Sequence, residues 1–317
     1  MRSLKPGLIE VSAYAPATVA NLAVGFDILG MAIDGAGDTV TLTRSQESGI
    51  RILEVKPATG LTLDASSNTA TAGLLEMISD LGIESGFEVV IEKGIPLSSG
   101  MGGSAASAVA GIVALNAFLE SPVTTKELIH YALIGESVAS GSRHGDNVVP
   151  ALLGGLQLTR SVDPVEVLEI PLPEAVHCVV VHPSHRVDTK MARSILRKEM
   201  FLKEHVRAAA DLATLIHACH RSDLKLIGKC LRDNLIEPQR MELIPGFMSV
   251  KKAAMEAGAL GCSISGSGPS VFAWFEDMAS AEKAKNGMIE AFKAAGLSAQ
   301  GGISKGRCGG ARVTRRL

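Results

Sequence analysis

The residues PLSSGMGGSAAS, 96–107, carry the strongest local signal in this chain. They lie between a strand expected to end at Lys93 and a helix expected to run from Ser104 to Leu119. The glycines at 100, 102 and 103 permit positive φ angles and close backbone approach, and the helix that follows offers free N–H groups at its positive end. This combination is typical of a cradle for an anion, most naturally a phosphate.

Other uses of this glycine loop are less well supported. No GK[ST] triplet of a Walker A loop occurs, since the Gly-Lys pair at 228–229 is followed by Cys230. The spacing of Gly100, Gly102 and Ala105 fits the dinucleotide pattern G-x-G-x-x-G/A. However, six residues separate Lys93 from the first of these glycines, and a second helix rather than a strand follows, so a dinucleotide site is disfavoured. A turn that merely packs a helix on a sheet is the remaining alternative.

On both sides of the loop, the pattern predicts two α+β lobes. Upstream, apolar and alternating runs predict strands, and downstream a Thr124/Glu127 capping box opens a helix that runs to about Ser140. The expected strands are 40–43, 50–55, 87–91, 178–181 and 271–275, and the expected helices are 69–81, 104–119, 124–140, 189–197, 201–220, 223–231, 247–257 and 279–294. We place the lobe boundary near residue 160, with an N-terminal lobe over 1–160 and a C-terminal lobe over 161–317.

Composition and charge narrow the class of partner. The 317 residues include 31 Lys plus Arg and 33 Asp plus Glu, a net charge of −2, so we expect neither nucleic acid nor a membrane as partner. The uncharged helix over 104–119 is too short to span a bilayer, and no apolar run of signal-peptide length precedes Glu10. The five cysteines form no CxxC pair. We therefore expect a cytoplasmic protein with buried, reduced thiols, and its oligomeric state stays open, with a homodimer as one option.

Three segments together resemble the motifs of the GHMP kinases, in the order that this superfamily uses. The residues 96–107 are similar to its phosphate-binding motif, ATVANLAVGFDILG (17–30) to its substrate motif, and GCSISGSGPSVFAWF (261–275) to its C-terminal glycine motif. The resemblance spans the chain from about Val11 to Phe275. Two further segments, SRHGDNV (142–148) and EPQRMELIPGF (237–247), are similar to the members that act on homoserine.

The resemblance implies a two-lobe fold, a nucleotide and a metal. The first lobe is expected to resemble the second domain of ribosomal protein S5 and the second lobe to be ferredoxin-like, with the active site between them. ATP is the implied phosphoryl donor, with Mg²⁺ bound by Ser104 and Glu136. The implied phosphate-binding residues are Pro96, Leu97, Ser98, Ser99, Gly100, Met101, Gly102, Gly103, Ser104, Ala105 and Ala106.

The implied acceptor is L-homoserine, a zwitterion whose hydroxyl would be phosphorylated as a step of threonine biosynthesis. A carboxylate suits its ammonium group and a guanidinium suits its carboxylate. The resemblance assigns substrate binding to Asn21, Asp27, His144, Asn147, Arg193 and Arg240, and catalytic roles to Asp27, Asn147 and Thr189. A dedicated general base is not required by a loose transition state, and Asp27, then Asp146, are the carboxylates to test.

Several alternatives stay open at this point. Taken alone, Glu136 reads as a solvated helix carboxylate, and Arg193 and Arg240 read as surface ion-pair residues. The histidine pairs 182/185 and 217/220 lack a third ligand at a supporting spacing and are read as structural. The chain departs from the family at Gly103, where a serine is usual, and at 23–24, where Gly-Pro is usual. A GHMP kinase for another small alcohol and a non-catalytic ligand sensor are the two rival functions.

Overall fold

The computed structural model describes residues 2–58 and 60–317. Its strands are β1 (Glu10–Ala20), β2 (Leu29–Ser45), β3 (Ile50–Lys56), β4 (Gly86–Lys93), β5 (Leu156–Val162), β6 (Val165–Ile170), β7 (His177–Pro183), β8 (Gly261–Ile264), β9 (Val271–Phe275), β10 (Ala299–Lys305) and β11 (Arg312–Arg316). Its helices are α1 (Thr69–Leu81), α2 (Gly103–Phe118), α3 (Thr125–Ser140), α4 (Gly145–Leu153), α5 (Thr189–Ser194), α6 (Leu202–Arg221), α7 (Leu224–Cys230), α8 (Glu237–Arg240), α9 (Phe247–Glu256) and α10 (Met278–Ala294), with a 3₁₀ turn, η1 (Met241–Leu243).

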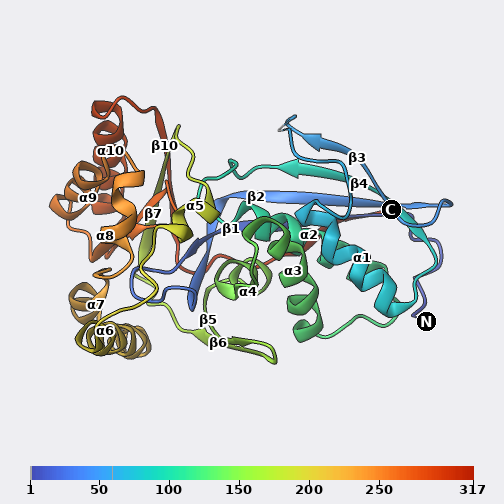
Figure 1. Ribbon diagram of the computed structural model, residues 1–317, viewed down its shortest axis with the longest axis horizontal. Coiled ribbons are helices and arrows are strands. Elements are labelled where there is room, and N and C mark those ends of the chain that lie inside the picture. Colours follow the sequence, from blue (N-terminus) through green and yellow to red (C-terminus); the bar gives the residue numbers. More distant parts are fainter. Residues whose placement is uncertain (1, 59) are drawn as a thin grey trace.

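The strands form two sheets, one for each lobe. The first has the order β11-β1-β2-β4-β3, with the β5–β6 hairpin also pairing to β2, and the parallel pair β3–β4 is connected by α1. The second has the order β10-β7-β9-β8 and is antiparallel throughout. Because helices connect β7 to β8 and β9 to β10, this is the predicted ferredoxin-like arrangement. In Figure 1, α8, α9 and α10 lie at one end of the molecule and α1 lies towards the other.

Strands β7, β8 and β9 of the second sheet are buried on both faces, which explains their largely apolar sequences. On β7, Val179 and Val181 pack with the apolar faces of α9 and α10. The alternate residues Cys178 and Val180 belong to the larger core cluster, which also contains buried residues of α6 and α7. The period of two along β7 therefore separates two helical layers.

Close packing explains the small residues of α2. This helix is buried over most of its length, and its Gly111 lies where a Cβ atom would be 2.4 Å from the carbonyl oxygen of Ala70 on α1. Similarly, a Cβ on Gly135 of α3 would come within 2.5 Å of the carbonyl oxygen of Thr69. Glycine at these two positions lets the three helices α1, α2 and α3 approach one another closely, which fixes the helix start that follows the phosphate loop.

The local predictions for this lobe are confirmed. Asn68 caps α1 by accepting a hydrogen bond from the N–H of Ala70, and Thr124 and Glu127 form the reciprocal capping box of α3.

All five cysteines are buried, free thiols. Among the helices of residues 2–58 and 60–317, none combines the length and apolar character that a membrane span needs.

The lobe boundary differs from the sequence-based one. Residue 160 lies inside β5, and both β5 and β6 extend the first sheet. At the other end of the chain, β11 pairs with β1, so that Arg316 lies opposite Val11. The second lobe is therefore an insertion between β6 and β11 of the first. The sequence reading also missed β1, β5, β6, β8, β10 and β11, and it expected no helix at 145–153, where the structure has α4.

Candidate active site

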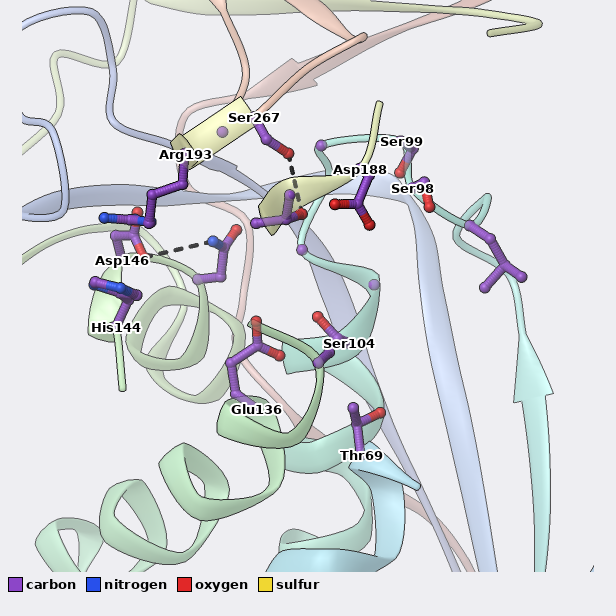
Figure 2. Close-up of a pocket in the computed structure, with 18 of the residues that line it drawn as sticks. Thr69, Ser98, Ser99, Ser104, Glu136, His144, Asp146, Asp188, Arg193 and Ser267 are labelled. Carbon is purple, nitrogen blue, oxygen red and sulfur yellow. Dashed lines mark hydrogen bonds between the residues drawn. The ribbon is translucent and has the colours of Figure 1, made fainter. Parts of the chain in front are cut away.

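A cavity of about 300 Å³ lies where the two lobes meet. It is lined by Asn21, Phe26, Asp27, Leu61, Thr69, Lys93, residues 96–100 and 102–104, Glu136, Ala139, His144, Asp146, Asn147, Asp188, Thr189, Arg193, Arg240, Gly266 and Ser267. Every residue predicted for the site belongs to this lining except Met101, Ala105 and Ala106. Ala105 and Ala106 are fully buried, and Met101 packs against the core. In Figure 2 the labelled side chains from both lobes face this common space.

The phosphate loop has the backbone conformation that its glycines predict. Its φ angle is +75° at Gly100 and +68° at Gly102, and Ser98 also has a positive φ of +52°. Gly102 is the N-cap of α2, so the N–H groups of the first helical turn have no capping side chain. A Cβ on Gly102 would lie 2.1 Å from the hydroxyl oxygen of Thr18, which leaves no room for any other residue.

The C-terminal glycine motif forms the loop 265–270 between β8 and β9, here called the second glycine loop. It contacts the phosphate loop from the other lobe. Ser265 donates a hydrogen bond to the carbonyl oxygen of Gly100 over 2.7 Å, and the N–H of Ser270 donates to the carbonyl oxygen of Ser99 over 3.1 Å. A Cβ on Gly100 would lie 2.4 Å from the carbonyl oxygen of Ser265. The two glycine motifs are thus in direct contact across the lobes.

Glu136 and Ser104 form the oxygen pair predicted to hold a cation. Glu136 is 9% exposed, so the reading of it as a solvated carboxylate is wrong. Burial raises the pKa of Glu136 to about 7, a hydrogen bond with Ser104 lowers it, the charge of Asp146 raises it and that of Lys93 lowers it. A hydroxyl and a carboxylate are hard oxygen donors that suit Mg²⁺, and both face the cavity beside the phosphate loop (Figure 2).

The opposite part of the cavity carries charges of both signs. Arg193 on α5 forms a bidentate pair with Asp27, which lies in the loop between β1 and β2. The guanidinium groups of Arg193 and Arg240 each lie 5.3 Å from the ring centroid of Phe26. This loop is conformationally unusual, with positive φ at Asn21 and Asp27 among others, and such residues cost about 1–3 kcal/mol each and cluster at functional sites.

Arg240 is a buried cation and not a surface ion-pair residue. It is 2% exposed, and it donates hydrogen bonds to the carbonyl oxygens of Ala192 and Gly266, both over 3.0 Å. Burial and the neighbouring charge of Arg193 lower the pKa of Arg240 to about 10. The guanidinium therefore stays charged at neutral pH, and an anionic group of a ligand would relieve its desolvation.

The start of α4 brings three further predicted residues into the site. His144 is the N-cap residue, and its Nδ1 lies 3.6 Å from the carboxylate of Asp27. Burial lowers the pKa of His144 more than the charge of Asp27 raises it. Asn147 accepts a hydrogen bond from the hydroxyl of Thr18 over 2.7 Å, which fixes its amide. Burial, then the charge of Asp27, raises the pKa of Asp146 to about 7.

The remaining predicted residue, Thr189, lies in the cavity lining and contacts the second glycine loop of its own lobe. Its hydroxyl oxygen lies 3.3 Å from that of Ser267 in the second glycine loop. Meanwhile the histidine pairs stay outside the lining. His182 contacts the hydroxyl of Ser270, and His185 contacts the carbonyl oxygen of Leu243. Within the described ranges no group of three or more metal-ligating residues gathers.

Sequence reasoning missed several lining residues. Lys93, Phe26, Asp188 and Thr69 lie in the cavity wall, yet none belongs to the predicted set. The position of Lys93 as the last residue of the strand before the phosphate loop was a usable signal, because that position is next to the loop in the chain. Thr69 follows a helix N-cap, and its proximity to the loop depends on how α1 packs on α2, which the local sequence does not specify.

Comparison with known proteins identifies the class of this site. The family model for the GHMP kinases N terminal domain matches residues 68–155, and the model for GHMP kinases C terminal matches residues 215–294. The phosphate loop and Glu136 lie inside the first match, and the second glycine loop lies inside the second. The cavity between the lobes is that of a GHMP kinase.

Curated relatives narrow the class further. Homoserine kinase from Xanthomonas campestris pv. campestris is 49% identical over 299 residues, 94% of this chain and 92% of the relative, and that from Xylella fastidiosa is 47% identical over 309 residues, 97% and 95%. The chain belongs to the homoserine kinase family. A crystal structure of homoserine kinase from Cytophaga hutchinsonii superimposes with a TM-score of 0.94 at 41% identity, covering 98% of this chain and 99% of that one. Mevalonate kinase from L. major shares the fold alone, with a TM-score of 0.72 at 16% identity over 96% of this chain and 99% of that one.

Proposed function

We propose that this protein transfers the terminal phosphoryl group of ATP to the side-chain hydroxyl of L-homoserine, giving O-phospho-L-homoserine for threonine biosynthesis. The observation that supports this best is the joint lining of one cavity by a phosphate loop and by Asp27, Arg193 and Arg240. A zwitterionic alcohol has the charges that these three side chains complement. Mevalonate has no ammonium group for Asp27 to bind.

The phosphate loop and the start of α2 would hold the nucleotide phosphates. The backbone N–H groups of the first helical turn and the positive end of the helix attract an anion, and the positive φ angles of Gly100 and Gly102 bring the backbone close to it. Ser104 and Glu136 would bind Mg²⁺, which supplies charge neutralisation between the phosphates when it is bound. This metal pair distinguishes a kinase from a ligand sensor that has kept the fold.

The substrate would lie on the other side of the cavity, held at both ends. We assign its ammonium group to Asp27 and Asn21, and its carboxylate to Arg193 and Arg240. Asn147, fixed by Thr18, and Thr189 would orient the hydroxyl towards the phosphate loop. Placing the nucleophile in line is the main demand that phosphoryl transfer makes on the protein.

Loss of the hydroxyl proton needs no dedicated base in a loose transition state. Asp27, the first carboxylate considered from sequence, is engaged with Arg193 through both oxygens, which weakens its case as a proton acceptor. Asp146 is buried in the same wall, with a pKa raised to about 7. Asp146 is therefore the carboxylate better suited to accept a proton at neutral pH.

A coupled ADP-release assay with ATP and Mg²⁺ tests the proposal. L-Homoserine, mevalonate, galactose and L-threonine would be compared as acceptors at equal concentration. We expect strong turnover with L-homoserine and at most background with the others. ATP binding without turnover on any alcohol would instead favour the sensor function.

A further inference from the structure

Lys93 lines the cavity wall, yet its ammonium group is held by groups of the protein on both sides of the phosphate loop. Its side chain is 5% exposed. It forms an ion pair with Asp38 and donates hydrogen bonds to the carbonyl oxygen of Gly103 over 2.7 Å and to the hydroxyl oxygen of Ser107 over 2.8 Å. An ammonium group has three N–H donors, so these three acceptors satisfy it completely.

Asp38, on β2, is the central acceptor of the same hydrogen-bond network. Its side chain is fully buried, and Oδ1 accepts hydrogen bonds from the N–H groups of Gly94 and Ile95, both over 3.1 Å. Its Oδ2 accepts from Lys93 and, over 2.7 Å, from the hydroxyl of Ser107. The two oxygens thus fix the entry to the phosphate loop and the second turn of the helix that follows it.

The network therefore binds both ends of the phosphate loop, residues 94–95 before it and 103–107 after it. The backbone of the loop between them has an energetically unfavourable conformation. Between these two ends, Ser98, Gly100 and Gly102 have positive φ angles. At Ser98 this conformation is strained, because the residue is not a glycine. A buried ion pair is itself a poor source of stability, because desolvation offsets much of its attraction. The buried charges of Asp38 and Lys93 are therefore better explained by a conformational role than by a contribution to stability.

We propose that Asp38, Lys93 and Ser107 form a clamp that holds the phosphate loop and the start of α2 in the shape that receives the nucleotide phosphates. The clamp rests on the proposed function, since it presumes that the loop binds ATP. Lys93 is in this view a positioning residue, because its ammonium group donates its hydrogen bonds to other protein groups and not to the nucleotide. Its charge additionally favours the ionised form of Glu136.

The test separates positioning from stability. Asp38→Asn or Lys93→Met alone would leave a buried group without its partner and destabilise the fold, whereas the double variant removes both charges. We expect the double variant to recover most of the lost Tm. Its Kd for ADP with Mg²⁺, measured by calorimetry without homoserine, should nevertheless rise by about tenfold or more, because a displaced loop misplaces its donors. The KM for homoserine should change much less than the KM for ATP.

A matched control is available in the other lobe. Lys251 pairs there with Glu237, which also accepts a hydrogen bond from Ser263. The double variant Glu237→Gln/Lys251→Met removes a similar ion pair that is part of neither the phosphate loop nor the cavity lining, and we expect its Kd for ADP to match the wild type. Equal losses of ADP affinity in both double variants would mean that general destabilisation, and not the clamp, is responsible.

Ser107→Ala decides the case if the Asp38/Lys93 double variant does not fold. This change removes one hydroxyl of the clamp, and we expect a several-fold higher Kd for ADP. An unchanged Kd in Ser107→Ala, or a loss confined to variants of Lys93, would overturn the clamp and mark Lys93 as a direct phosphate ligand. Failure of the proposed function would look different, since the wild type would bind ADP and still not phosphorylate homoserine.

Discussion

Arg193 and Asp27 are joined across the two lobes by a bidentate ion pair, with hydrogen bonds of 3.0 Å from Nη1 to Oδ2 and 2.8 Å from Nη2 to Oδ1. Each residue also lines the cavity in which we place homoserine. The pair thus satisfies internally the two charges that the substrate would engage. A zwitterion can replace it and leave neither charge unpaired, whereas an alcohol with one charge would strand one of the two side chains.

The first prediction concerns this exchange of partners. Asp27→Asn should raise the KM for homoserine by roughly 10–100-fold, because a charge-assisted hydrogen bond is replaced by a neutral one. In the wild type, 3-amino-1-propanol and 4-hydroxybutanoate should both be far poorer substrates than homoserine. Steady-state kinetics on the three alcohols checks this. Arg197→Gln, which loses a surface pair with Glu204 in the same lobe, serves as control and should leave the KM unchanged.

The second prediction concerns Arg240. Arg240→Lys should raise the KM for homoserine, because a point charge cannot reproduce the planar fork of a guanidinium. Because Arg240 also bridges the carbonyl oxygens of Ala192 and Gly266, the variant should lower the Tm as well. Kinetics and thermal unfolding would be measured on the same preparation. A normal KM with a lowered Tm would assign Arg240 a structural role alone.

The third prediction sets function against stability at Glu136. In the folded protein the pKa of Glu136 is about 7, above its ordinary value of 4.5, so folding favours the protonated form. The contribution of Glu136 to stability is therefore present at low pH and lost as the pH rises through about 7. Glu136→Gln should stabilise the metal-free protein at pH 8 by roughly 1–3 kcal/mol. The same variant should lower turnover by at least about 100-fold while leaving the KM for homoserine nearly unchanged.

Thermal unfolding at pH 5 and pH 8 gives the check on Glu136, with turnover measured on the same samples. The gain in Tm should appear at pH 8 and shrink at pH 5, where the wild-type carboxyl is already neutral. Full turnover in Glu136→Gln would remove this residue from the metal site. An equal change in Tm at both pH values would contradict burial as the cause of its raised pKa.

The fourth prediction follows from the same carboxyl and concerns Mg²⁺. A carboxyl must lose its proton to bind a cation, so the affinity for Mg²⁺ should fall as the pH drops below about 7. Binding of Mg²⁺ in the presence of ADP should also release protons near this pH. Calorimetry in two buffers of different ionisation enthalpy measures that release. A proton count at pH 6.5 no greater than that of Glu136→Gln, in which only ADP can release protons, would argue that Glu136 is already ionised there.

How much of this site the sequence specifies depends on the range of the interactions. The conformation of the phosphate loop was predictable, because Gly100 and Gly102 are required where φ is positive. The ferredoxin-like lobe and the membership of Asp27, Asn147 and Arg193 in one cavity followed from the family resemblance. By contrast, Asp38 and Lys93 are 55 residues apart and meet only because β2 pairs with β4. Local pattern does not specify such a contact.

Two further elements, β11 and α4, were also not predictable from the local sequence. The strand β11 has an exposed, arginine-rich sequence without a clear apolar alternation, and it forms because the edge of β1 is available to pair with it. Likewise, the first turn of α4 contains the charged Asp146, which burial in the site makes costly. Residues selected for a site break the patterns by which helices and strands are predicted, which is why the sequence pattern does not indicate α4.

The last prediction uses two glycines of the phosphate loop as a matched pair. Gly100 has a φ of +75°, and its Cβ would lie 2.4 Å from the carbonyl oxygen of Ser265 and 2.6 Å from that of Gly268. Gly103 has no positive φ, and the nearest atom to its Cβ would be the methyl carbon of Ile95, at 3.2 Å. A side chain at 100 therefore pushes the two lobes apart, whereas one at 103 requires only a small adjustment.

Gly100→Ala should accordingly lower kcat/KM by at least about 100-fold, since the two glycine loops can no longer meet. Gly103→Ser introduces the serine that the family usually carries there, and we expect it to leave the Tm within a few degrees and the kcat within about threefold. If its hydroxyl reaches the phosphates, the Kd for ADP should fall. Equal damage from both substitutions would mean that the loop needs glycine for flexibility throughout, and not for the contact between the lobes at Gly100.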